Sequence, residues 1–409
     1  MYSKTLKNCQ ICNSSKIEEV LDLGYMPPVN SFISLDKVKV KEEEIFFPTQ
    51  FFHCKKCNFF QLGCIVDKEI IFPKSYPYTS STTKILRDNF KDLANKCFSN
   101  FSIFKNDLIL DIGSNDGNLL SNFKKKMKVV GITPENIGKL AIKKGIPTIL
   151  DYFNNKSSNK FLENFGKAKI ITATNVFAHI DNPNELTKNV KKCLADDGIF
   201  IVEIHYATSL IKTLQYDTIY HEHMRYYTLY SLIKLLNKNG LYIFDAELIP
   251  THGGSLRIYS SKVKIKKTNQ IKNILKDEKK YLTKNKILEF VKKVHHSKFS
   301  LLKIIKEIKI RNKKIFAVGA PSRATTLVNF VGLDNYSIDY ILEKSGSHKI
   351  GKHMPGTNIP VVDENILRSK KADYLLILSW HISKDLIKIF RSNGYKGKFI
   401  IPLSKPKII

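Results

Sequence analysis

Short apolar runs alternate with amphipathic stretches from about residue 80 to residue 260 of the chain. The runs are rich in Val, Ile and Leu and have the length of buried strands. They lie at residues 108–111, 129–132, 170–173 and 198–204. Residues 137–144 and 184–194, which fall between them, repeat apolar side chains at helical spacing. Strands that alternate with helices in this way predict a parallel sheet with helices on both faces.

A second unit of the same kind is predicted near the C-terminus. Residues 262–312 are rich in lysine and place apolar side chains at helical spacing, which indicates a helical linker. A strand pattern at residues 314–319 then leads through a Gly-Ala-Pro-Ser turn into a helix pattern. Further strand candidates lie at residues 337–342, 374–378 and 398–401. With 409 residues, the chain is long enough for two or three domains.

Four of the seven cysteines form two C-x-x-C pairs, Cys9 with Cys12 and Cys54 with Cys57. Each pair can direct two thiolates at one ion, and four thiolates complete a closed, structural zinc shell. A redox-active or simply buried pair is the alternative. No apolar run reaches the ~20 residues of a membrane-spanning helix, and the N-terminus lacks the apolar core of a signal peptide. We therefore expect a cytoplasmic protein without a membrane partner, in which thiols favour a metal over disulfides.

The formal net charge of +30 raises the question of a nucleic-acid surface. The lysines are spread along the whole chain among Ile and Asn, and no basic stripe with interleaved aromatic residues is present. We therefore expect no nucleic-acid partner. The charge is interpreted as solvated helix faces and as a field that attracts an anionic small substrate. A zinc-containing nucleic-acid binder is the competing hypothesis.

The clearest cofactor signal is LILDIGSNDGNLL at residues 108–120. A strand pattern ends in Asp111, and Gly113 then allows a tight turn and the close approach of a ligand. The pattern resembles the S-adenosylmethionine motif of class I methyltransferases, and an ordinary strand–turn–helix is the alternative. Thr133 stands where that class usually has an acidic residue for the ribose, so the bond it can supply is neutral and weaker. The candidate contacts are Asp111, Gly113, Ser114, Asn115, Asp116, Thr133, Glu135 and Asn175.

The segment YHEH at residues 220–223 carries the candidate chemistry. Two histidines flank Glu222, and such a cluster can remove a proton, hold a charge and stack on a ring. A hydrogen beside a ketone is acidic because the carbanion delocalises onto oxygen, so a base of suitable pKa can remove it. Because the segment follows the methyltransferase pattern, it indicates methyl transfer to a carbon that must first be deprotonated.

With these residues in view, the chain resembles the sugar C-methyltransferases of deoxysugar biosynthesis over nearly its whole length. Those enzymes methylate C3 of a nucleotide-linked 4-keto-6-deoxyhexose. The resemblance rests on the four N-terminal cysteines and on PVNSF (28–32), YPYTS (76–80), DIGSNDG (111–117), NVFAHI (175–180), YHEH (220–223), HGGSLRIY (252–259), GAPSRATTLVN (319–329) and MPGT (354–357). The departures are His205, where the family tends to have proline, Ala324, where it tends to have glycine, and residues 342–351, a segment that usually begins Val-Asp.

The resemblance implies roles for individual residues. His223 would be the general base, Glu222 and Tyr220 its hydrogen-bonding neighbours, and His179 a residue beside the methyl donor. His221 is interpreted as a packed histidine. Arg257 would meet a phosphate or carboxylate, and the helix amides after the GAPS turn would favour a phosphate. The implied substrate contacts are Asn30, Phe32, Tyr76, Tyr78, His252, Arg257, Pro321, Ser322 and Arg323.

The predicted fold class is α/β. A class I methyltransferase Rossmann-like domain at residues 76–261 is flanked by an N-terminal zinc-binding domain at residues 1–75. A helical linker at 262–312 leads to a second α/β Rossmann-like domain at 313–409, which would help to bind a nucleotide sugar. The expected activity is S-adenosylmethionine-dependent methyl transfer to the carbon beside the ketone of a nucleotide-linked keto-deoxysugar. The sequence is compatible with a monomer and does not fix the oligomeric state. The alternatives are an O- or N-methyltransferase acting on a nucleotide sugar, and a member that binds the sugar nucleotide without methylating it.

Overall fold

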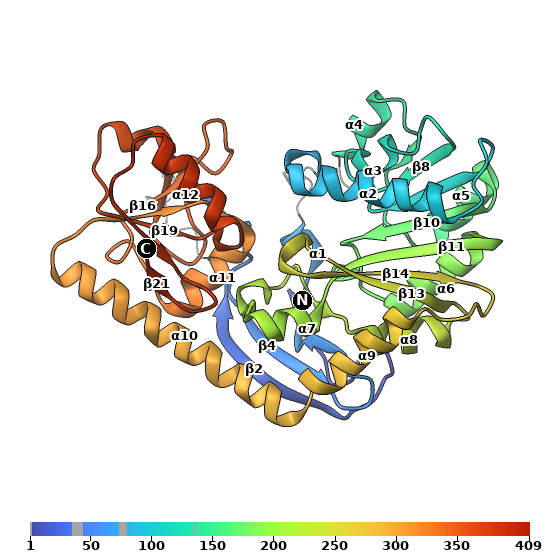
Figure 1. The fold of residues 1–409 in the computed structure, drawn as a ribbon, viewed down its shortest axis with the longest axis horizontal. Coiled ribbons are helices and arrows are strands. Elements are labelled where there is room, and N and C mark those ends of the chain that lie inside the picture. Colours follow the sequence, from blue (N-terminus) through green and yellow to red (C-terminus); the bar gives the residue numbers. More distant parts are fainter. Residues whose placement is uncertain (1, 35–43, 73–79, 135) are drawn as a thin grey trace.

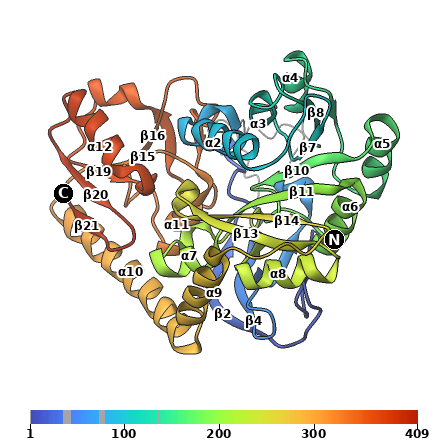
Figure 2. The ribbon, with the colours of Figure 1, turned by 45° about the vertical axis from the view of Figure 1, so that its right-hand side comes forward.

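Two α/β domains lie at opposite ends of the molecule, with N-terminal strands between them (Figure 1). The protein is described by a computed structural model that covers residues 2–34, 44–72, 80–134 and 136–409. Tyr76, Tyr78 and Glu135, which the sequence singled out, lie outside the described residues. The long helix α10 (Lys284–Ile310) runs from the central domain to the C-terminal domain, as both views show (Figures 1 and 2).

The central domain is built on a seven-stranded sheet in the order β13-β14-β11-β10-β7-β8-β9. Its parallel strands are β7 (Leu108–Ile112), β8 (Lys128–Ile132), β9 (Thr148–Ile149), β10 (Ala168–Thr174) and β11 (Leu194–His205). At the other edge, β14 (Ser255–Ser261) runs antiparallel to both β11 and β13 (Tyr242–Ile249). The four strand runs predicted in this part of the chain are all present.

Helices cover both faces of this sheet, as the alternation of apolar runs predicted. Alternate residues of β7 point to opposite faces, so Leu110 packs in one core and Ile109 in the other. The first core also holds side chains of α5 (Asn155–Phe165), α6 (Pro183–Cys193), α8 (Leu229–Lys238) and α9 (Asn269–Tyr281). The second holds side chains of α2 (Lys84–Asn100), α3 (Asn118–Ser121) and α4 (Gly138–Lys143).

The C-terminal domain has an eight-stranded sheet in the order β21-β20-β19-β15-β16-β18-β17-β3. Its parallel centre consists of β15 (Ile315–Val318), β16 (Tyr340–Glu343), β18 (Pro360–Asp363), β19 (Tyr374–Ile377) and β20 (Lys398–Ile401). Two further strands run antiparallel to their neighbours in this centre, β17 (Lys352–His353) beside β18 and β21 (Lys407–Ile408) beside β20. The turn after β15 leads into α11 (Ser322–Val331), as the sequence predicted.

The N-terminal domain exchanges strands with both α/β domains. Its sheet pairs β2 (Ile17–Met26), β4 (Phe47–Cys54) and β5 (Phe60–Leu62) in the order β12-β5-β4-β2. Strand β12 (Arg225–Tyr226) belongs to the central part of the chain and directly follows the YHEH segment. In return, β3 (Ile33–Ser34) pairs with β17 at the edge of the C-terminal sheet. The three domains are therefore tied together through backbone hydrogen bonds.

The predicted helical linker contains two helices with different partners. Ile271 and Ile274 of α9 are buried in the core of the central domain. Apolar residues of α10, such as Val294 and Leu301, are buried together with residues of the C-terminal domain and of β2. Across the residues that the structure describes, every helix is too short or too polar to cross a membrane.

Candidate functional site

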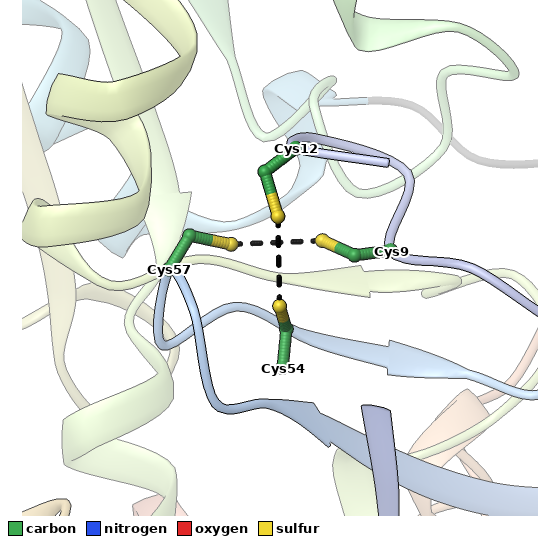
Figure 3. Close-up of side chains that lie close together, drawn as sticks. All are labelled: Cys9, Cys12, Cys54 and Cys57. Atoms are coloured by element: carbon green, nitrogen blue, oxygen red, sulfur yellow. Dashed lines mark hydrogen bonds between the residues drawn. The ribbon is translucent and has the colours of Figure 1, made fainter. Parts of the chain in front are cut away.

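The four cysteines of the two C-x-x-C pairs come together at one point (Figure 3). Their sulfur atoms all lie within 4.8 Å of one another, with 3.5 Å between Cys9 and Cys57 and 3.6 Å between Cys12 and Cys54. Four thiolates at Zn–S distances of ~2.3 Å in a tetrahedron have sulfur atoms ~3.8 Å apart. The residues present therefore fit a zinc ion, and the closed shell assigns it a structural role.

Both cysteine turns are built in the same way. In each, an asparagine follows the second cysteine and has a left-handed backbone, with φ of 56° at Asn13 and 53° at Asn58. Each asparagine donates its backbone N–H to the carbonyl of the first cysteine, Cys9 or Cys54. Asparagine tolerates this conformation better than most residues, so the sequence C-x-x-C-N closes the turn and directs both thiols to one side.

The predicted cofactor loop lies at the carboxyl end of β7, between the ends of β8 and β10. Gly113 has φ of 73°, and a Cβ atom there would come within 2.4 Å of the Val176 side chain. Glycine is required at this position by both the left-handed backbone and the nearby Val176 side chain. The Ser114 hydroxyl is buried, and no described residue hydrogen-bonds to it. Ligands of parallel α/β sheets bind at this edge, so the close backbone approach and the unsatisfied hydroxyl fit a bound S-adenosylmethionine.

The other predicted cofactor contacts surround this loop. Thr133 follows β8 and is buried, and Asn175 follows β10 with φ of 57°. Burial raises the pKa of Asp111 to about 7, although its carboxylate accepts a hydrogen bond from Thr172. Asp116 accepts a hydrogen bond from Ser80 and pairs with Lys144 at 3.2 Å. The Asn115 side chain accepts from the Ser80 backbone N–H, so both residues fasten the chain that enters α2 to the loop.

The YHEH segment lies where the three domains meet, and successive side chains face different domains. His221 points into the N-terminal domain, where Nε2 lies 3.3 Å from the Thr49 hydroxyl and 3.2 Å from the Pro48 carbonyl. It also packs edge-on against the Phe47 ring. It is buried, and the described residues offer no partner to its Nδ1. This environment is that of a packed histidine, as predicted.

Tyr220 and His223 instead face the central domain. Their rings stack with centroids 4.3 Å apart, and the tyrosine oxygen lies 3.3 Å from His223 Nε2. His223 Nδ1 is 3.3 Å from the Thr218 carbonyl. Because a carbonyl only accepts, Nδ1 carries the hydrogen, and Nε2 is left with a lone pair toward the tyrosine hydroxyl. The segment thus presents a neutral imidazole whose basic nitrogen is fixed.

His179 lies beside this pair, and its predicted place beside the methyl donor stays a prediction. Its ring centroid is 5.2 Å from that of His223, and its Nδ1 is 2.6 Å from the Glu222 carbonyl. Burial lowers the pKa of His223 well below its usual range, and the charges of His179 and His205 act in the same direction. Burial also raises the pKa of Tyr220 well above its usual range. Burial likewise lowers the pKa of His179. At neutral pH both imidazoles are therefore uncharged and the tyrosine keeps its proton.

Glu222 connects this group to the other two domains. Its carboxylate accepts a hydrogen bond of 2.6 Å from Asn30, and Asn30 donates to the Ser322 hydroxyl at 3.0 Å. Ser322 is the first residue of α11, and Pro321 is its N-cap. The amide before them, that of Ala320, donates to the Glu343 carboxylate at 2.6 Å. The structure thus brings together three predicted substrate residues, Asn30, Pro321 and Ser322, at the start of α11. The Ala320 amide in the same turn is already bonded to Glu343.

Lys349 lies beside the start of α11, close to Ala320 and Phe32, although the sequence analysis did not select it. Its ammonium group donates to the Ala320 carbonyl at 2.5 Å and lies 4.9 Å from the centre of the Phe32 ring. Burial lowers its pKa, and the charges of Glu343 and Glu222 oppose that shift. One signal could have identified it: Lys349 lies in the segment that departs from the family pattern.

Arg323 makes a second interdomain contact. Its guanidinium forms two hydrogen bonds of 2.8 Å with Asp217 and stacks over the Trp380 ring. The Trp380 indole also donates to Asp217, at 2.7 Å. His252, another predicted substrate residue, lies in the HGG turn with φ of 53°, and its side chain is exposed. Asp217 and Trp380 were missed by the sequence analysis, since neither lies in a recognisable motif.

Arg257 has a different environment from the one predicted. Its side chain is fully buried, and its guanidinium bonds to Glu203 at 2.6 Å, to Asp92 at 3.1 Å and to Glu247 at 3.0 Å. It also donates to Asn89 of α2. The arginine does meet carboxylates, but they are the protein's own. The geometry favours a structural role that fixes α2 to the sheet over a contact with substrate.

Three family models match successive parts of the chain. A zinc binding domain matches residues 9–72, a methyltransferase domain residues 82–245, and a C-methyltransferase C-terminal domain residues 250–404. The C-methyltransferase NovU of Streptomyces niveus is 26% identical over 415 residues, which are 99% of this chain and 97% of that protein.

Solved structures also resemble part of the chain. An S-adenosylmethionine-dependent methyltransferase from Clostridium acetobutylicum shares 16% identity, with a TM-score of 0.34, over 44% of this chain and 93% of its own. The magnesium protoporphyrin IX methyltransferase of Synechocystis, solved with S-adenosylmethionine, shares 12% identity, with a TM-score of 0.34, over 43% and 79% of the two chains.

Proposed function

We propose that this chain, which matches methyltransferase and C-methyltransferase family models over successive segments, uses S-adenosylmethionine to methylate the carbon beside the ketone of a nucleotide-linked keto-deoxysugar. The family models of the methyltransferase and C-terminal domains, together with the likeness to NovU over almost the whole chain, establish the methyl transfer to carbon. The substrate class and the roles of individual residues are our proposal.

The observation that carries this proposal is the lone pair on His223 Nε2. A carbon beside a ketone becomes a nucleophile only after a base has removed its proton, and the C–H electron pair then delocalises onto the carbonyl oxygen as an enolate. His223 is neutral and has Nδ1 occupied by Thr218, so Nε2 can take that proton. Transfer to a hydroxyl or amine would need no base for carbon.

Tyr220 suits the other half of the step. Its hydroxyl lies 3.3 Å from His223 Nε2 and keeps its proton because burial raises its pKa. When a substrate carbon takes the place beside Nε2, the hydroxyl can turn to the carbonyl oxygen and stabilise the enolate. Glu222, held by Asn30, would orient a substrate hydroxyl.

S-adenosylmethionine, when bound, supplies the electrophilic methyl group. Gly113, Ser114, Thr133 and Asn175 surround the crevice that would hold it. His179 follows Asn175 in the same loop and contacts His223. The chain's own work is therefore to hold a neutral base and an acidic carbon next to that crevice, because alignment of the reacting atoms supplies much of the rate.

The nucleotide would contact the C-terminal domain. The α11 amino end has backbone N–H groups that favour a phosphate, and Lys349 adds a cation beside it. Arg323 is less suited to this role, since Asp217 already compensates its charge.

Mass spectrometry of a panel of keto-sugar nucleotides after incubation with S-adenosylmethionine tests the substrate class. We expect one product heavier by a methyl group, with the new carbon–carbon bond located by NMR beside the carbonyl. Methylation on oxygen or nitrogen would contradict the proposed chemistry, and no product from any keto-sugar would contradict the substrate class.

A further inference from the structure

His205 is a further residue near the reacting groups, and the chemistry described so far does not use it. It ends β11, the strand next to β10, whose loop carries His179. Its side chain is partly buried, and it lies close enough to His223 that a charge on His205 would lower the pKa of His223. The His205 Nε2 atom lies 3.3 Å from Gln215 Oε1.

The surroundings of Gln215 fix the tautomer of His205. The amide nitrogen of Gln215 donates to the Gly253 carbonyl at 2.7 Å and to the Thr213 hydroxyl at 2.6 Å. A carbonyl only accepts, so the atom that faces Gly253 must be the nitrogen, and the atom that faces His205 must be the oxygen. That oxygen also only accepts, so the hydrogen of the neutral imidazole resides on Nε2.

The turn at residues 252–254 holds Gln215 in place. A Cβ atom on Gly253, which has φ of 82°, would come within 2.6 Å of the Gln215 amide oxygen. Gln215 is itself buried. The glycine therefore lets the turn close over the amide, and the amide cannot easily rotate. This gives the HGG turn a role in positioning a side chain of the site.

His205 consequently keeps a bare Nδ1. Burial lowers its pKa to about 3, helped by the charges of Arg323 and His252, so the ring is neutral. Within the described parts of the chain, Nδ1 has no hydrogen-bond partner. A partly buried acceptor without a partner is unfavourable unless water or a ligand donates to it.

We propose that Nδ1 of His205 accepts a hydrogen bond from a substrate hydroxyl close to the reacting carbon, and so selects hydroxylated over deoxygenated keto-sugars. The inference rests on the proposed function and deepens it by naming a group on the substrate.

The kinetic test uses pairs of keto-sugar nucleotides that differ by one hydroxyl. For one pair, the parent enzyme should favour the hydroxylated sugar in kcat/KM by roughly 2- to 10-fold, as expected for one hydrogen bond to a partly buried acceptor. His205→Phe, which keeps a ring but no acceptor, should bring that ratio close to one. His381→Phe is the matched control, an exposed histidine also near Arg323, and should keep the parental ratio.

Nitrogen NMR of histidine-labelled protein supplies a second measurement. In the free enzyme, His205 should show a protonated Nε2 and a bare Nδ1 at neutral pH, and Gln215→Leu should mix the two tautomers. The hydroxylated sugar, but not its deoxy partner, should shift the Nδ1 signal. A protonated Nδ1 in the free enzyme, or a parental ratio in His205→Phe, overturns the inference alone. If the parent enzyme methylates none of the sugars, the proposed substrate class is wrong, and the inference about the substrate hydroxyl is then wrong as well.

Discussion

Replacing His223 with alanine should separate proton removal from folding. The substitution removes the lone pair on Nε2 and leaves the Tyr220 hydroxyl in place. It also removes two hydrogen bonds of 3.3 Å, to Thr218 and to Tyr220. Both are long for hydrogen bonds of their kind, so the loss should cost about 1–2 kcal/mol of folding stability.

The cost to the reaction should be larger. A well-placed general base contributes ~10²–10⁴ in rate, which corresponds to about 3–5 kcal/mol at tenfold per 1.36 kcal/mol. Affinity for the sugar nucleotide should change little, because the C-terminal domain and the Asn30–Glu222 pair are untouched.

Deuterium exchange measures the base without methyl transfer. In heavy water, with the keto-sugar nucleotide and S-adenosylhomocysteine, the parent should incorporate deuterium beside the carbonyl. His223→Ala should lose this exchange and methyl transfer together. If the variant exchanges deuterium at the parental rate, the base lies elsewhere, and Glu222 and His179 are the next candidates.

His221→Ala is the matched control, two residues away. Its imidazole is buried against Phe47 and bonds to Thr49 and Pro48, so truncation leaves a cavity and should cost about 3 kcal/mol of stability. The fraction that stays folded should exchange deuterium at nearly the parental rate. His223→Ala should therefore lower mainly the exchange rate, and His221→Ala should lower mainly the melting temperature. A rate defect in His221→Ala equal to that of His223→Ala would refute the assignment.

Four other predictions follow from the structure. Elemental analysis should find one zinc per chain, and Cys54→Ser should unfold the N-terminal domain, as measured by proteolysis; a metal-free folded protein would contradict this. Thr133→Asp should bind S-adenosylhomocysteine about fivefold more tightly by calorimetry, from a charge-assisted bond of ~1 kcal/mol, although the buried carboxylate should lower the melting temperature without ligand. Arg257→Met should cost about 3–5 kcal/mol in chemical denaturation because it leaves Glu203 buried and unpaired, and Glu203→Gln should recover part of that loss. Finally, the lowered pKa of His223 keeps the base neutral, and hence active, at pH values below the usual histidine range near 6.5; kcat/KM should fall only in more acidic solution, and an acid limb at or above 6.5 would count against it.

The elements of the fold were accessible from sequence because each depends on neighbouring residues. The apolar run before Gly113 is buried on both faces of its strand, so it has no polar alternation and is recognised as a parallel strand. The C-x-x-C spacing likewise predicts each thiol pair locally. The prediction that the two pairs meet, although Cys9 and Cys57 are 48 positions apart, followed from zinc chemistry, which requires four ligands.

The exchanged strands β3 and β12 could not be predicted from the sequence in this way. Strands β3 and β12 have two residues each, which is too short to show the alternation of apolar and polar residues by which a strand is recognised. Their partners lie in other domains. The ion pair between Asp217 and Arg323 joins residues 106 positions apart, and nothing in either local sequence identifies the other. The role of Arg257 was misjudged for the same reason, because Asp92 lies 165 residues before it.

The strand exchange fixes the YHEH segment at the point where the three domains meet. The segment continues into β12, which is fixed to the N-terminal sheet, so its backbone is held by a domain other than the one that surrounds the cofactor loop. His221 is buried in that sheet, and His223, two residues further on, is turned toward His179. Glu222 reaches Asn30, whose chain enters the C-terminal sheet a few residues later as β3. Any rotation of one domain against the others would therefore move His223 relative to both the loop after β7 and the amino end of α11. If the proposed function holds, the central domain supplies both the base and the methyl donor, the C-terminal domain contacts the nucleotide, and the N-terminal strands keep the two domains in register at the carbon that is methylated.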